Sequence, residues 1–126
     1  MSDRTTFGIR IQVGTRYVPE RSRSNLWLYE YTVRITNQGE HPAQLLSRHW
    51  IIENAFAQRE EVRGPGVVGE TPRLEPGDVF VYTSFCPLST PTGQMYGSYQ
   101  MVFDDGEEFD AIVDPFHLTL PSEYTH

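Results

Sequence analysis

The chain contains no lysine, and all ten of its basic residues are arginine. A Schiff base on a lysine amine and the phosphate-binding lysine of P-loop proteins are therefore excluded. The single cysteine, Cys86, allows neither an internal disulfide nor an all-cysteine zinc site, which is typical of a reducing compartment. No apolar run reaches the roughly 18 residues of a membrane span. Residues 1–6 lack the pattern of a signal peptide. We expect a cytoplasmic protein without a membrane partner.

Acidic residues outnumber basic ones, and the formal net charge is −7 at pH 7. Non-specific binding of DNA or RNA depends on neutralising phosphates, so we expect no nucleic-acid partner. A length of 126 residues is typical of one domain that buries its own core without disulfides or metals. Residues 1–126 are therefore expected to form a single domain.

The apolar residues recur mostly with a period of two, which indicates strands, and no segment is a convincing helix. The first run, for example, places Phe7, Ile9, Ile11 and Val13 on one face. The Asp105-Gly106 pair between two alternating runs is a strong hairpin signal. Seven or eight short strands predict an all-β protein, an antiparallel β-sandwich. The expected strands cover residues 7–14, 27–36, 45–53, 58–62, 79–85, 95–103, 108–113 and 116–120.

The expected strand 45–53 has large apolar groups on both faces, so we place it in the middle of a sheet. Its alternation puts His49 on the face opposite to Arg48 and Trp50. Arg48 or His49 is a candidate ligand group beside an aromatic platform, whereas Trp50 fits better as a buried core residue. The faces are expected to carry Leu46, Arg48, Trp50 and Ile52 on one side and His49 and Ile51 on the other.

Residues 64–69 have the glycine spacing G-x-G-x-x-G, which in dinucleotide-binding proteins cradles a pyrophosphate. That chemistry needs a helix directly after the glycines, and Pro72 and Pro76 exclude one here. Two interpretations remain. The loop could bind an anion through its amides and the Arg63 guanidinium. Alternatively, it is a wide turn whose glycines adopt positive φ.

Five blocks of the chain form a specific pattern: residues 31–37, 43–52, 61–70, 82–84 and 90–99. These blocks resemble the signature of the ApaG family, and the resemblance extends over about residues 7–120. Such proteins have an immunoglobulin- or fibronectin-III-like sandwich, which agrees with the strand pattern. The family often has a small residue where this chain has Phe85-Cys86-Pro87, so no role is carried over to Cys86.

The resemblance implies no accepted enzymatic activity and no cofactor. Bacterial members take their name from an operon that also encodes a diadenosine tetraphosphate hydrolase, and they have been linked to cobalt and magnesium tolerance. In eukaryotes the domain is appended to an F-box protein and to a polymerase-δ-interacting protein. We therefore expect a non-catalytic module that binds a protein partner. The alternative is an accessory protein that binds phosphate or a nucleotide, in diadenosine polyphosphate metabolism or in cobalt and magnesium tolerance.

The remaining chemistry-bearing residues form no expected catalytic or metal site. Cys86 with His49 and an acidic residue is a conceivable nucleophile, but lone cysteines are more often small buried hydrophobes. The histidines have no ligand spacing, and the acidic hairpin at 104–110 has no calcium-loop register. The uncovered edges of a sandwich make a homodimer plausible. The predicted anion site comprises Arg63, Gly64, Gly66 and Gly69, with Arg48 and His49 as neighbours.

Overall fold

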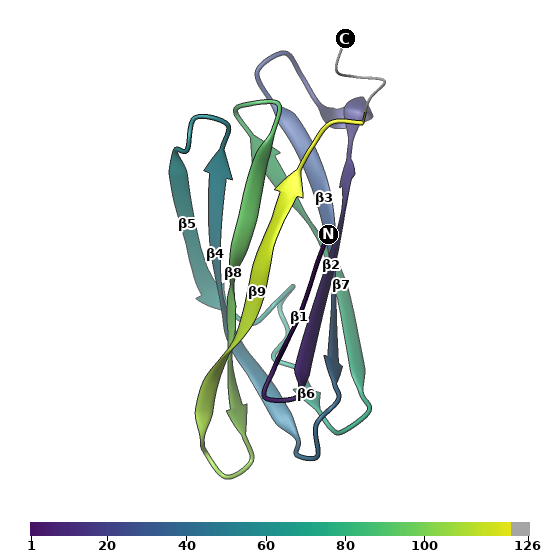
Figure 1. Ribbon diagram of the computed structural model, residues 1–126, viewed down its shortest axis with the longest axis vertical. Helices are drawn as coiled ribbons and strands as arrows, with labels where there is room; N and C mark the ends of the chain where they lie inside the picture. The colour runs from purple at the N-terminus through teal and green to yellow at the C-terminus, as the bar shows by residue number, and fades with distance from the viewer. Residues whose placement is uncertain (122–126) are drawn as a thin grey trace.

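The computed structural model describes residues 1–121 (Figure 1). This part of the chain consists of strands joined by turns, with one turn of 3₁₀-helix, η1 (Pro19–Arg21), and no α-helix. The strands are β1 (Ser2–Thr6), β2 (Ile9–Tyr17), β3 (Trp27–Asn37), β4 (Ala43–Asn54), β5 (Arg59–Pro65), β6 (Arg73–Leu74), β7 (Val79–Leu88), β8 (Gly93–Phe103) and β9 (Glu108–Leu118).

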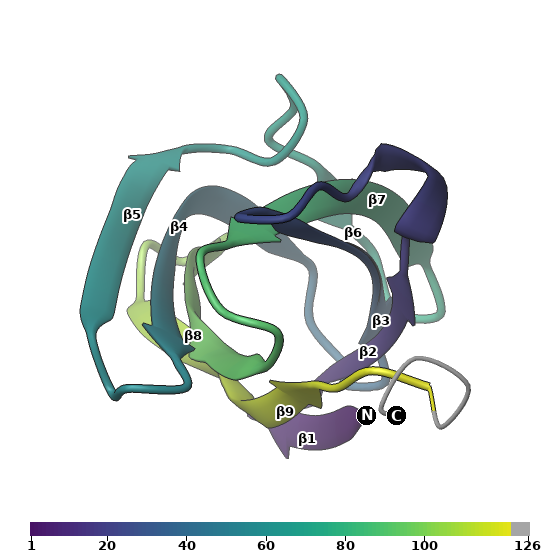
Figure 2. The same cartoon turned by 90° about the horizontal axis from the view of Figure 1, so that it is seen from above.

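The strands form two antiparallel sheets that pack face to face. The first sheet has the order β1-β2-β3-β7, and the second has the order β5-β4-β8-β9 with β6 beside β4. On one side the sheets are joined where β1 lies along β9 (Figures 1 and 2). There Arg4 Nη1 lies 2.8 Å from Asp114 Oδ1, and the Ile112 amide donates to Thr6 Oγ1. On the opposite side β5 and β7 do not pair (Figure 2). The predicted β-sandwich is confirmed, and one of its sides is open.

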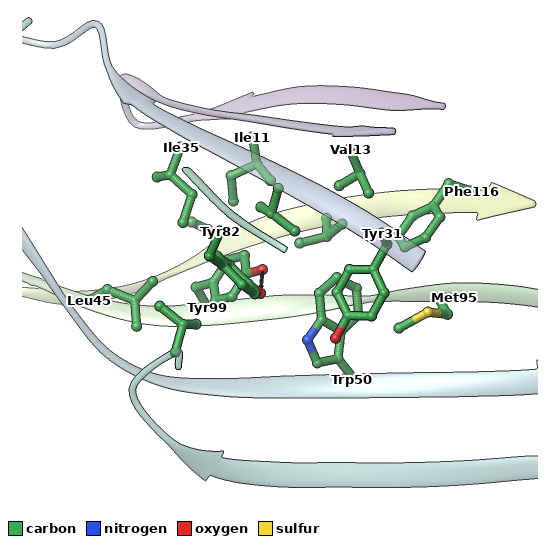
Figure 3. Packing of buried hydrophobic residues seen from close by; sticks show 14 of the residues in the cluster. Ile11, Val13, Tyr31, Ile35, Leu45, Trp50, Tyr82, Met95, Tyr99 and Phe116 are labelled. Atoms are coloured by element: carbon green, nitrogen blue, oxygen red, sulfur yellow. Dashed lines mark hydrogen bonds between the residues drawn. The ribbon is translucent and has the colours of Figure 1, made fainter. Parts of the chain in front are cut away.

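The core between the sheets is rich in aromatic side chains (Figure 3). Trp50, only 3% exposed, makes edge-to-face contacts with Tyr31, Tyr99 and Phe116 at ring-centre distances of 5.5, 5.9 and 5.9 Å. Aromatic rings prefer this arrangement because the positive edge of one meets the negative face of the other. The interpretation of Trp50 as a core residue is confirmed.

The expected position of Phe7 on the buried face of the first strand is wrong. Phe7 is 73% exposed, and with Gly8 it forms the tight turn between β1 and β2, at φ values of 47° and 84°. The inward alternation begins only at Ile9. The strand before the turn, β1, was not expected because its sequence, SDRTT, carries no apolar alternation.

The expected inward position of Leu46 is also wrong. Leu45 is fully buried, because the register between β4 and β8 shifts between Leu45 and Ser47. Such a bulge adds one residue to a strand and reverses the faces on its two sides. From Arg48 onward the expected alternation holds, and β4 lies between β5 and β8 as predicted.

Several boundaries differ from the expected ones. β5 extends to Pro65 and so includes the first motif glycine, β6 was not expected, and β9 unites two expected strands by passing through Pro115. In β9 the register with β8 shifts between Met95 and Gly97, next to that proline. Proline is tolerated there because the register shift leaves residue 115 without a pairing partner in β8.

Candidate functional site

The first glycine of the motif leaves room for an arginine. Gly64 pairs with Arg48 across β5 and β4. A Cβ atom on Gly64 would lie 2.9 Å from Nη2 and 3.0 Å from Cζ of Arg48, so the guanidinium packs on glycine backbone. Nη1 of Arg48 donates to the carbonyls of Pro65 and Gly66, both at 2.9 Å. The close approach of Arg48 is a structural reason for glycine at this position.

The second and third glycines belong to a two-residue hairpin. The Val67 amide donates to the Glu70 carbonyl at 2.8 Å, and the Glu70 amide donates to the Val67 carbonyl at 2.9 Å. Both central residues, Val68 and Gly69, have positive φ, 45° and 80°, as a type I′ turn requires. At Gly66, with φ of 59°, a Cβ atom would lie 2.3 Å from the Glu70 carbonyl oxygen.

The main-chain contacts of the loop engage some of the backbone amides that were expected to bind an anion. The Gly66 amide donates to the Leu46 carbonyl at 2.8 Å, and the Val67 amide is engaged in the hairpin. Pro65 has no amide hydrogen. Within residues 1–121 the amides of Val68 and Gly69 make no main-chain hydrogen bond. Of the four amides of residues 66–69, two therefore remain available at the loop tip.

Arg63 and His49 meet on the outer face of the second sheet. They are paired in the β4–β5 register, and both reach Glu61. His49 Nε2 lies 3.0 Å from Glu61 Oε2, and Arg63 Nη2 lies 3.6 Å from the same oxygen. The hydrogen bond with His49, aided by nearby positive charges, lowers the pKa of Glu61. Arg63 is 71% exposed, so its guanidinium is accessible from solvent.

The structure thus brings the six predicted residues together around β5 but divides them between two faces. Arg48 contacts the motif at Gly64 and Gly66, on the side of the gap between the sheets. His49 and Arg63 lie on the outer side. Anion binding at these residues stays a prediction.

The open side of the sandwich contains a cleft that the sequence analysis missed. It has a volume of about 250 Å³ and lies between β5 and β7. Its walls include the side chains of Tyr31, Trp50, Val62, Phe85, Cys86 and Met95. Arg48 and Glu60 also line it, and a second hollow of about 180 Å³ continues it past Ile52 and Pro87. The cleft exists because β5 and β7 do not pair. The available sequence signal was that β7, VFVYTSFCPL, carries no charged residue to protect a free edge.

The Arg48 guanidinium is half-buried and has no carboxylate within ion-pair distance in the described part of the chain. Its charge acts on the core tyrosines. Burial raises the pKa of Tyr82, and the nearby positive charge of Arg48 opposes that rise. The buried indole N–H of Trp50 lacks a well-aligned hydrogen-bond acceptor among residues 1–121, although its proximity to the Tyr82 hydroxyl lowers the pKa of that group.

Comparison with known proteins identifies the family. A family model for the ApaG domain matches residues 18–103, more than half of the chain. The chain belongs to the ApaG family. It is 56% identical over 121 residues to Protein ApaG of Anaeromyxobacter dehalogenans, covering 96% of this chain and 97% of that protein. It is 51% identical over 123 residues to Protein ApaG of Pseudomonas aeruginosa, again covering 96% and 97%.

Solved structures agree with this assignment. The crystal structure of the putative ApaA protein from Bordetella pertussis matches with a TM-score of 0.89 at 48% identity, covering 90% of this chain and 94% of that one. The C-terminal domain of wzt matches with a TM-score of 0.56 at 14% identity and shares the fold alone. The resemblance to ApaG proteins and the fibronectin-III-like sandwich are confirmed.

Within this ApaG fold, Cys86 and His49 are not neighbours. Cys86 is 2% exposed on the inner face of the first sheet, and burial raises the pKa of its thiol to about 12. His49 lies on the outer face of the second sheet. A thiol kept protonated and separated from the base has no route to nucleophilic activation through His49.

Some residues of the other charged regions are engaged in contacts with other parts of the chain. In the acidic hairpin, Asp104 Oδ2 lies 2.5 Å from Arg73 Nη2. In the arginine-rich loop, Arg16 Nε lies 3.1 Å from Glu30 Oε2, and the guanidinium carbon of Arg21 lies 5.0 Å from the centre of the Phe85 ring. Residues 1–121 contain no group of three or more metal-ligating side chains placed to hold an ion. Among the histidines, His126 lies outside the described residues.

Residues 1–121 include no helix with the length and apolarity that crossing a membrane requires.

Proposed function

We propose that this ApaG protein is a non-catalytic binding module of the cytoplasm that holds a protein partner at the open side of its sandwich. The observation that carries the proposal is the edge of β7. This strand pairs only with β3 among the described residues, and its ten residues carry no charge. Val79, Val81 and Phe85 on it are 43%, 50% and 44% exposed.

Free strand edges in monomeric proteins are usually blunted by charges, proline or a covering element, because bare edges pair with other chains. The other edges of this sandwich are protected in that way. The edge formed by β9 is covered by β1, and β5 carries Arg59, Glu60, Glu61 and Arg63. The edge of β7 lacks such protection over most of its length. An extended segment of a partner can add to it as a further strand, and a second copy of this chain is the homodimer alternative.

The test is affinity capture with the tagged full chain, followed by mass spectrometry. Val81→Lys places a charge on the β7 edge without removing core packing. Phe7→Lys is the matched control, since Phe7 is an exposed apolar residue in the β1–β2 turn. We expect proteins that the wild type and Phe7→Lys capture reproducibly and that Val81→Lys loses. Capture that is equal for all three chains, or absent for the wild type, contradicts the proposal.

A second candidate is a phosphate- or nucleotide-binding accessory function, related to diadenosine polyphosphates or divalent-cation tolerance. It rests on the 71% exposed Arg63 side chain and on the loop tip with two unengaged amides. Calorimetric titration with pyrophosphate, ATP and diadenosine tetraphosphate, with and without Mg²⁺, tests it. Arg63→Ala should weaken binding by about 1.5–3 kcal/mol, as for a charged hydrogen bond. Absence of heat at millimolar ligand excludes this candidate. Unchanged binding in Arg63→Ala excludes the role of Arg63.

A further inference from the structure

Two charged groups in the cleft between β5 and β7 have no ion-pair partner in residues 1–121: the guanidinium of Arg48 and the carboxylate of Glu60. Most other arginines near this region are paired. Arg59, which lines the continuation of the cleft, lies 3.1 Å from Glu53 Oε2, and Arg63 contacts Glu61 on the outer face. An unpaired, half-buried guanidinium is unusual because desolvation disfavours a charge without a counterion.

Arg48 is also fixed in position. Its Nη1 is held by the Pro65 and Gly66 carbonyls, and the absence of a side chain at Gly64 gives its guanidinium a flat support. Its Nε and Nη2 make no hydrogen bond within residues 1–121, so this side of the guanidinium keeps its donors for a ligand. A guanidinium fork held in this way matches the two oxygens of a carboxylate.

The charges stand at a spacing that suits an extended chain. Arg48 pairs with Gly64, Trp50 with Val62, and Ile52 with Glu60, so these positions share the inward face. On β4, the residue opposite Glu60 is Ile52. Ile52 lies four residues from Arg48 along the strand, a distance of about 13 Å at the rise of a β-strand. Between them lies apolar wall formed by Trp50 and Val62. A partner strand presents alternate residues at the same intervals.

We propose that the cleft receives an extended segment of a partner protein with an acidic residue at Arg48, an apolar residue two positions along, and a basic residue two positions further, at Glu60. The proposal fixes the order of these three residues along the cleft, and the partner chain can run in either direction. The charge complementarity commits the site to a peptide with both charges, and the uncharged free edge of β7 supplies main-chain partners. This inference rests on the proposed protein-binding function and names the chemistry of its partner.

The test is selection of displayed random dodecapeptides against the full-length protein. We expect enriched peptides with an acidic and a basic residue four positions apart and an apolar residue midway. Arg48→Gln should abolish the preference for the acid, and Glu60→Arg should replace the basic residue by an acidic one. Arg10→Gln, in β2 and paired with Asp3 of β1, is the control away from the cleft and should leave the pattern unchanged. Because Glu60 is exposed, its variant keeps the test decisive even if Arg48→Gln fails to fold.

A synthetic peptide with the enriched pattern gives the quantitative check. Replacing its acidic residue by the corresponding amide should weaken binding about tenfold or more for the wild type and little for Arg48→Gln. No enrichment, a pattern without the acid, or an unchanged pattern in Glu60→Arg overturns the inference. So does a dimer in sedimentation that Glu60→Arg dissociates, since a second copy would then fill the cleft. If cellular partners depend on Val81 but are indifferent to Arg48 and Glu60, this inference fails while the proposed function stands.

Discussion

Replacing Gly66 by alanine separates the structural role of the motif from a phosphate-binding role. The new Cβ atom would lie 2.3 Å from the Glu70 carbonyl oxygen, and the residue would have to keep a φ of 59°. A left-handed φ costs a non-glycine residue about 1–2 kcal/mol. Overpacking adds about 1–3 kcal/mol. The variant should therefore be clearly less stable than the wild type even without any ligand.

Local opening of the hairpin limits this cost. The loop can relieve the clash by releasing Val67, which is 1% exposed, and by breaking the hairpin hydrogen bonds. Exposing a valine costs about 1.5–3 kcal/mol, and each hydrogen bond contributes about 0.5–1.5 kcal/mol. Both routes lead to a loss of about 3 kcal/mol, which corresponds to a fall of about 10 °C in Tm for a domain of this size.

Urea and thermal unfolding followed by tryptophan fluorescence measure the effect. Gly69→Ala is the matched control: it also has positive φ, 80°, but a Cβ atom there would meet nothing within 4 Å. Its cost should be about 1–2 kcal/mol, from the backbone conformation alone. If Gly66→Ala loses no more stability than Gly69→Ala, the close approach to Glu70 is not what requires glycine, and the structural account of the motif is refuted.

Three further predictions concern the loop, the core and the outer face. Val68→Asn should raise the free energy of unfolding by about 1 kcal/mol, because asparagine tolerates the left-handed φ of a type I′ turn and Val68 is 56% exposed; a loss of stability in urea unfolding would contradict this. Tyr82→Phe or Tyr99→Phe alone should cost about 1–3 kcal/mol by leaving a buried hydroxyl unpaired, whereas the double variant should cost less than the sum; additive losses in the double-mutant cycle would contradict the pairing. His49→Ala should raise the pKa of Glu61 in a carboxyl NMR titration. Since the folded-state pKa lies below the ordinary value of 4.5, the stabilisation by this contact is present above about pH 4.5 and is lost as pH falls through the lowered pKa; an unshifted titration would exclude the contact in solution.

Alternation was sufficient to predict the sandwich because most strands bury one face against a single core. The alternation pattern failed to predict a strand that does not bury an apolar face. β1 is a polar strand held by pairing with β2 and by contacts with β9, and no periodicity in SDRTT reveals it. It also failed at Leu45, where a bulge reverses the faces and single-sequence patterns contain no sign of the extra residue.

The sequence proposed the residues of the candidate site but could not place them relative to one another, and their binding role stays a prediction. Sequence spacing places Arg48 and Gly64 sixteen positions apart, and only the antiparallel register makes them direct neighbours. The same register places Arg63 beside His49 on the other face. The cleft could not be predicted from the sequence for a different reason. It depends on which strands do not pair, and strand pairing is a property of the whole topology.

The glycine spacing itself follows from three separate local requirements. Gly69 supplies one of the two left-handed residues of a hairpin turn, and Gly66 permits the approach of the Glu70 carbonyl. Neither requirement needs a ligand. Gly64 differs, because what it accommodates is a charged side chain with unused donors rather than backbone. The hydrogen bonds to the Pro65 and Gly66 carbonyls use only Nη1 of Arg48, and a half-buried guanidinium without a counterion costs free energy that an anion would recover. We therefore propose Arg48, on the cleft side, ahead of the loop amides as the group that binds a partner's negative charge.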